Sequence, residues 1–64
     1  HFGENDYAIP MDAVDLIRNT YQDATVHVYA NAGHGFNCDM RADYHESSAN
    51  LALERTLEFI AKNL

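Results

Sequence analysis

The spacing of apolar residues along the chain predicts two helices. In the first half, apolar positions recur every three or four residues, as on one face of an amphipathic helix, and predict a helix over Pro10–Thr20. A proline suits the first turn because the N–H that it lacks has no partner there. The same spacing predicts a last helix, whose apolar stripe is Ala49, Leu53, Leu57, Ile60 and Leu64. Asp43 and Glu46 have the spacing of a capping box that would open it.

Two other segments have the pattern of strands. Thr25–Tyr29 is rich in β-branched and aromatic residues, and alternation places Val26 and Val28 on one face. Phe2-Gly3 reads as the end of another strand that runs into a polar loop. The order strand, helix, strand, helix predicts parallel strands joined by a right-handed crossover, which is a βαβα segment of an α/β fold. Parallel sheets are normally covered on both faces, and one such unit cannot cover both.

Each predicted strand is followed by a loop that carries one residue suited to catalysis. Working residues of open α/β sheets gather beyond the carboxyl ends of the strands, and here Asp6 follows the first strand and His34 the second. Adjacent parallel strands lie about 4.8 Å apart, so the two side chains can meet. A carboxylate that holds one imidazole nitrogen leaves the other as a base. We expect Gly33 and Gly35 to let this loop turn with positive φ; Asp6 could instead serve only an Asx turn.

The pair would be the acid and the base of a nucleophile–acid–histidine triad. In α/β-hydrolases the nucleophile comes first in the chain, on a G-x-[SC]-x-G turn, and no such turn occurs in these residues. Cys38 follows the histidine, so we interpret it as a buried structural thiol. A zinc site is an alternative that lacks the usual paired spacing. Its ligands would be His34, Cys38, Asp39 and His45.

The stretches HFGENDYAIP and VHVYANAGHGFNCDMRADYHESSANLALERTLEFI, in this order, closely resemble the C-terminal end of the dienelactone hydrolase family, the carboxymethylenebutenolidases. The resemblance covers essentially all of residues 1–64, but only the last portion of a family domain. It implies an α/β-hydrolase fold in which Asp6 matches the triad acid and His34 the base. It also implies that a cysteine or serine nucleophile lies in the absent N-terminal part. The implied activity is hydrolysis of small esters or lactones without metal or cofactor.

One position departs from the family pattern. The best-known dienelactone hydrolases place an arginine four residues after the histidine, where it helps to hold the substrate carboxylate. Here that position is Cys38, and the nearest arginine is Arg41. Arg41 is therefore a candidate substrate-binding residue, and a salt bridge near the last helix is the alternative. The departure leaves the family resemblance intact but removes the ground for naming dienelactone itself as the substrate.

The charge and the apolar content of the chain argue against two classes of partner, nucleic acids and membranes. The net charge is −6 and the four basic residues are scattered, so neither nucleic acid nor a membrane surface is expected as a partner. No apolar run approaches the roughly 20 residues of a membrane span. A single cysteine excludes an internal disulfide and favours a reducing compartment, so we expect a cytoplasmic protein.

The small size of the chain suggests a second interpretation. A chain of 64 residues buries a small core and is marginally stable alone. We expect it to be inactive by itself as a catalyst. The exposed half-sheet and amphipathic helices favour, as the alternative to a hydrolase segment, a non-catalytic α/β module that associates with itself.

Overall fold

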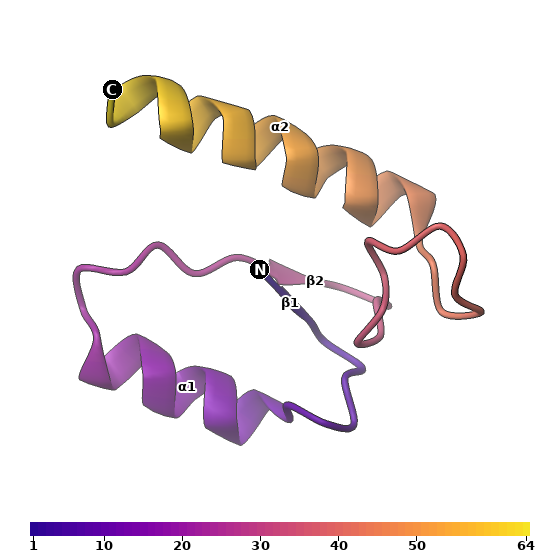
Figure 1. Ribbon diagram of the computed structural model, residues 1–64. Coiled ribbons are helices and arrows are strands. Elements are labelled where there is room, and N and C mark those ends of the chain that lie inside the picture. Colours follow the sequence, from indigo (N-terminus) through magenta and orange to yellow (C-terminus); the bar gives the residue numbers. More distant parts are fainter.

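The computed structural model describes all residues from 1 to 64, and its elements follow in the order strand, helix, strand, helix (Figure 1). These elements are β1 (Phe2–Gly3), α1 (Met11–Thr20), β2 (Val28–Tyr29) and α2 (Glu46–Lys62). The two strands are parallel, with Phe2 opposite Val28 and Gly3 opposite Tyr29. The predicted element order and the parallel pairing are confirmed.

The strand β2 is shorter than the predicted strand over Thr25–Tyr29. Its pairing is limited because β1 offers only two residues to the ladder. Backbone hydrogen bonds extend beyond the two strands, since the N–H of Phe2 donates to the carbonyl of His27 and the N–H of Glu4 donates to that of Tyr29, both at 2.9 Å. The last of these bonds holds the start of the loop after β1 against the end of β2.

The helix α1 begins one residue later than predicted. Pro10 is its N-cap residue, with an extended backbone (φ −68°, ψ 163°), and Asp12 lies in the first turn, where the helix dipole favours a negative charge. Val14 is completely buried and anchors the helix to the rest of the chain. Neither helix has both the length and the apolar content that crossing a membrane would require.

The two helices lie on opposite sides of the strands (Figure 1). On the α2 side the core is a cluster of four buried residues, Tyr29, Ala32, Phe36 and Ala52. The rings of Tyr29 and Phe36 lie 5.1 Å apart, and the guanidinium of Arg55 lies 5.3 Å from the centre of the Tyr29 ring, within the range of a cation–π contact. This cluster packs β2, the loop after it and the first half of α2 into one body.

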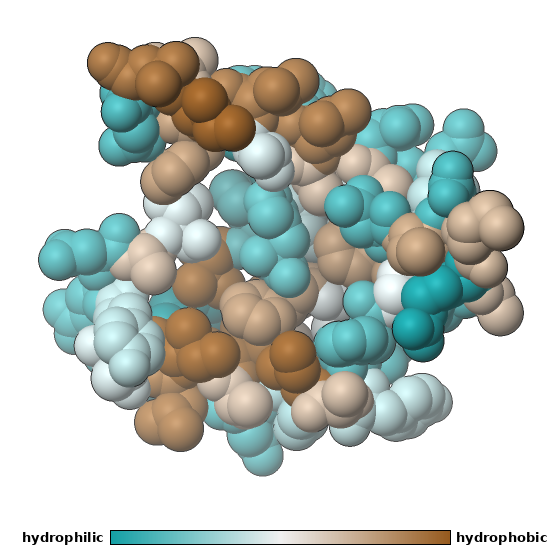
Figure 2. Space-filling model, in the orientation of Figure 1, coloured by the Kyte–Doolittle hydropathy of each residue, from teal (hydrophilic) through white to brown (hydrophobic).

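The apolar stripe predicted for the last helix is largely exposed. The helix buries Ser48, Ala49 and Ala52 instead. Of the predicted stripe only Ala49 is buried, and the exposed fractions of the other members are 59% for Leu53, 58% for Leu57, 46% for Ile60 and 99% for Leu64. The physical reason is that two strands of two residues offer too little surface for a helix of 17 residues. Figure 2 shows the resulting band of apolar side chains along α2.

The predicted capping box is also wrong. The helix begins at Glu46, its N-cap residue is His45, and no side chain caps its first amides. Nδ1 of His45 instead forms a hydrogen bond of 2.6 Å with the hydroxyl of Ser48. Asp43 cannot act as the cap because its carboxylate is engaged in the loop that carries His34.

Candidate active site

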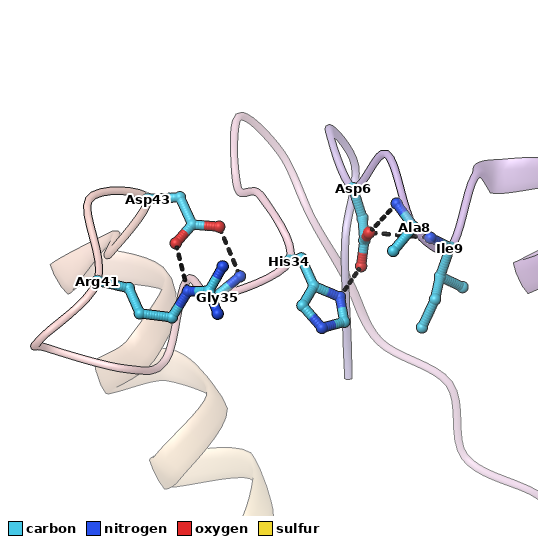
Figure 3. A network of polar contacts seen from close by, with 7 residues as sticks. All are labelled: Asp6, Ala8, Ile9, His34, Gly35, Arg41 and Asp43. Carbon is cyan, nitrogen blue, oxygen red and sulfur yellow. Dashed lines mark hydrogen bonds and ion pairs between the residues drawn. The ribbon is translucent and has the colours of Figure 1, made fainter.

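Asp6 and His34 meet at the carboxyl ends of the two strands, as the sequence predicts (Figure 3). Oδ2 of Asp6 lies 2.8 Å from Nδ1 of His34. The carboxylate is almost completely buried, whereas the side chain of His34 is 53% exposed. A buried carboxylate therefore holds Nδ1 of an imidazole that is half exposed.

The loop after β1 holds the carboxylate of Asp6 in place. Oδ1 of Asp6 accepts hydrogen bonds from the N–H groups of Ala8 and Ile9, at 2.8 and 2.9 Å. The side chain thus forms an Asx-type turn with one oxygen and contacts His34 with the other, so the turn does not exclude the contact with the histidine, and the role of Asp6 as an acid remains a prediction. The hydrogen bonds of the turn and the contact with His34 together fix the orientation of the Asp6 carboxylate.

The contacts of Asp6 keep it ionised. Burial is the largest single influence and opposes ionisation, but the hydrogen bonds from Ile9, His34 and Ala8, with the positive charge of protonated His34, together lower the pKa of Asp6 below its ordinary value. An ionised carboxylate only accepts hydrogen bonds. Neutral His34 must therefore carry its proton on Nδ1, which leaves the lone pair of Nε2 available as a base.

The loop after β2 brings His34 to Asp6 through backbone geometry at Asn31. This residue has a φ of 61°, in the left-handed region that asparagine tolerates, and it turns the chain at the end of the strand. The N–H of Asn5 then donates to the carbonyl of Ala32 at 2.8 Å, which joins the two loops directly. Asn31 was not among the residues predicted to shape this loop, although an asparagine two residues after a strand is a signal for such a turn.

The predicted reason for the glycines around His34 is wrong. No glycine in the chain has a positive φ, so Gly33 and Gly35 do not supply a left-handed turn. The space beside them matters instead, because a Cβ at Gly35 would come within 2.5 Å of Oδ1 of Asp43 and closer still to Nε of Arg41. The glycines allow a close approach of side chains from later in the loop.

Arg41 was predicted either to bind substrate or to form a salt bridge near the last helix, and in the structure it contacts Asp43. Its Nε donates to Oδ1 of Asp43 at 3.3 Å, in an exposed pair before α2. Arg41 also lines, together with His34, an open cavity of about 590 Å³. The salt bridge is therefore present, and the position of Arg41 beside the histidine leaves a substrate-binding role as a proposal.

Cys38 is exposed, which contradicts its interpretation as a buried thiol. Its backbone takes part in consecutive turns, since its N–H donates to the carbonyl of Gly35 and its carbonyl accepts from the N–H of Arg41. These turns occupy the surface and direct the side chain outward. The predicted zinc alternative also has no support, because no group of three or more potential metal ligands lies close enough together to hold an ion.

Comparison with known proteins gives one consistent result. Residues 1–64 match the family described as "Dienelactone hydrolase family". A protein named "Putative carboxymethylenebutenolidase" from Salmonella typhimurium is 38% identical over 65 residues, which are 95% of this chain and 24% of that protein. Proteins of the same name from Salmonella typhi and Escherichia coli K12 are each 37% identical, over 95% and 91% of this chain.

The lengths differ between this chain and those proteins. The chain spans about a quarter of the length of the curated relatives that it matches. The match to the family, in contrast, runs from the first residue of the chain to the last. The chain therefore belongs to the dienelactone hydrolase family.

Proposed function

We propose that residues 1–64 are the C-terminal part of one α/β-hydrolase domain and supply the acid and the base of its catalytic triad. The nucleophile, a cysteine or a serine, would come from a part of the protein outside these residues. The observation that carries the proposal is the 2.8 Å contact between Nδ1 of His34 and the buried carboxylate of Asp6. Family membership and the chain order of acid before histidine support it.

In this mechanism His34 moves protons and Asp6 stabilises charge. Nε2 of His34 accepts the proton of the nucleophile as the nucleophile attacks the ester carbonyl carbon. The imidazolium then gives that proton to the leaving oxygen, and the acyl group remains on the nucleophile. Water attacks the acyl carbon while Nε2 takes its proton, and the acid product leaves as the nucleophile is protonated again. Asp6 stays ionised throughout and stabilises the imidazolium.

Small esters or lactones are the proposed substrates. The cavity that His34 and Arg41 share is open, and a guanidinium beside the base suits a substrate that carries a carboxylate. We propose no metal and no cofactor for this chemistry. The free, exposed Cys38 is compatible with a reducing compartment, and a cytoplasmic location remains our proposal.

Comparison of the full-length protein with the 64-residue chain tests the proposed function. We expect the full-length protein to hydrolyse p-nitrophenyl acetate, because it brings the nucleophile to His34. We expect no turnover above the buffer rate from the purified 64-residue chain, because it holds only the acid and the base. Release of p-nitrophenolate measures both. Turnover by the purified chain that persists after His34→Ala would contradict the proposal.

The exposed stripe of α2 favours a second candidate function for the isolated chain. Leu53, Leu57 and Ile60 project from the same helix, and their exposed surface is costly in water. We propose that two copies of the isolated chain associate through this stripe. In the full-length protein the remainder of the domain would cover it.

Sedimentation of the 64-residue chain at increasing concentration tests the association. We expect a dimer in the wild type and a monomer in Leu57→Glu, because a buried unpaired carboxylate at the centre of the stripe is unfavourable. Met40→Glu makes a similar substitution at an exposed loop position and should leave the dimer intact. A wild-type chain that stays monomeric at millimolar concentration would remove this candidate.

A further inference from the structure

Asp43 binds the backbone next to His34. Its Oδ2 accepts the N–H of Gly35 at 2.7 Å, and its Oδ1 accepts Nε of Arg41 at 3.3 Å (Figure 3). Gly35 is buried, and Asp43 supplies the acceptor that its amide needs. Hydrogen bonds from an amide to a carboxylate are stronger than those between neutral groups.

The two glycines beside His34 both make room for Asp43. A Cβ at Gly33 would lie 3.1 Å from Oδ2 of Asp43, and a Cβ at Gly35 would lie 2.5 Å from Oδ1. The carboxylate of Asp43 is therefore seated against the residues on either side of the histidine. The sequence G-H-G at these positions is explained by this contact rather than by backbone φ.

His34 needs such support because its own side chain is held at one point. Its side chain is half exposed, and its hydrogen bond to Asp6 is made through Nδ1 alone. The ring stands on a surface loop, and a small displacement of that loop would carry Nδ1 away from Asp6. Displacements of about 1 Å in a catalytic group cost on the order of 100-fold in rate.

We propose that Asp43 is a positioning residue for His34. By accepting the N–H of Gly35, it fixes the backbone on which the imidazole stands, so that Nδ1 stays on Asp6 and Nε2 faces the reacting group. The kinetic part of this inference rests on the proposed function of His34 as the base. The structural part concerns the His34–Asp6 contact and holds whether or not the protein is a hydrolase.

The charge of Asp43 is maintained by the same contacts. The hydrogen bond from Gly35 is the largest influence on its pKa, and burial acts in the opposite direction. With the guanidinium of Arg41 beside it, the pKa of Asp43 lies below its ordinary value. Asp43 is therefore ionised at neutral pH and can accept both hydrogen bonds.

A pair of substitutions in the full-length protein separates the amide contact from the charge. Asp43→Ala removes the acceptor of the Gly35 N–H. Asp43→Asn keeps one oxygen for that N–H and loses only the ion pair with Arg41. Asp39→Ala removes an exposed acidic residue from the same loop and serves as the matched control, because the partner of both Gly35 and Arg41 is Asp43.

Steady-state kinetics with p-nitrophenyl acetate gives the first measurement. We expect Asp43→Ala to lower kcat by roughly 10- to 100-fold because the base is displaced. KM should stay within about twofold, since p-nitrophenyl acetate carries no carboxylate for the released Arg41 to bind. Asp43→Asn should keep kcat within about threefold of the wild type because it retains the amide contact. Asp39→Ala should behave as the wild type.

The low-field NMR signal of the His34 Nδ1 proton gives the second measurement, and it is independent of activity. We expect this signal in the wild type and in Asp43→Asn, and its loss or strong broadening in Asp43→Ala. Should the full-length protein lack hydrolase activity, the proposed function fails, and this signal still decides the role of Asp43.

Three results would overturn the inference. One is a wild-type kcat together with an unchanged Nδ1 signal in Asp43→Ala. Another is an equal loss of kcat in Asp43→Ala and Asp43→Asn when circular dichroism shows that both variants are folded. If Asp43→Ala does not fold, Asp43→Asn carries the test, and the loss of the Nδ1 signal in a folded Asp43→Asn protein is the third.

Discussion

Asp6→Asn should lower kcat for ester hydrolysis by the full-length protein by roughly 10,000-fold, the scale known for the equivalent change in a serine protease triad. The contacts of Asp6 explain why an isosteric change is so costly. Oδ1 accepts the N–H groups of Ala8 and Ile9, so an asparagine must keep its single oxygen on that side. Its NH₂ group then faces Nδ1 of His34. That arrangement places the proton of neutral His34 on Nε2, where the base is needed.

The same reasoning predicts that acid and base act as one unit. His34→Ala should lose about as much kcat as the Asp6→Asn, His34→Ala double variant, because an asparagine has nothing to orient once the imidazole is gone. Asp12→Asn, on an exposed position of α1, is the isosteric control and should keep wild-type activity. Multiplicative losses in the double variant would show that Asp6 acts on the reaction independently of His34.

A pH titration of stability provides a second measurement of the same pair. The pKa of Asp6 is lower in the folded state than in an unfolded chain, so its contribution to stability is complete above the ordinary aspartate pKa. That contribution is lost as the pH falls through the lower, folded value. We therefore expect the urea midpoint of Asp6→Asn to fall less steeply with acid than that of the wild type. Parallel acid profiles of the two proteins would contradict the lowered pKa.

The elements that were predictable depend on local patterns. Thr25, Val26 and Val28 mark the segment in which β2 lies, and the apolar spacing of three and four residues marks α2, without knowledge of the fold. Asp6 and His34 could be paired because each follows a strand, and parallel strands bring their exit loops to one edge. These inferences need only the chain order and the geometry of a βαβ unit.

The features that could not be predicted are contacts between residues outside one local pattern. The glycines beside His34 show that something lies close to the backbone, but nothing in G-H-G identifies Asp43, eight residues later, as that group. The three-residue spacing of Asp43 and Glu46 matches the capping-box rule, so the sequence favours a helix cap. That spacing is the same when Asp43 instead accepts the N–H of Gly35, so the rule cannot distinguish the two roles. The exposure of Leu57 likewise follows from how little sheet the chain contains, a property of the whole fold.

Gly3→Ala should produce the largest loss of stability among the three glycine-to-alanine substitutions in the chain. A Cβ at Gly3 would lie 2.5 Å from the carbonyl oxygen of Gly33 and closer still to that of Ala32. Both contacts are with backbone atoms, which cannot rotate away as a side chain can. We expect a loss of about 3 kcal/mol, at the upper end of what overpacking usually costs, measured as the free energy of unfolding in urea.

Gly33→Ala is the matched control for this substitution. The three atoms nearest to its Cβ would be side-chain atoms of Asp43, the nearest at 3.1 Å, so a small shift of that side chain relieves the contact. We expect a loss of less than about 1 kcal/mol there. Equal urea midpoints for Gly3→Ala and Gly33→Ala would contradict the contact with the backbone. Because the atoms that Gly3 approaches belong to the loop leading into His34, Gly3→Ala should also separate His34 from Asp6 and lose the Nδ1 signal.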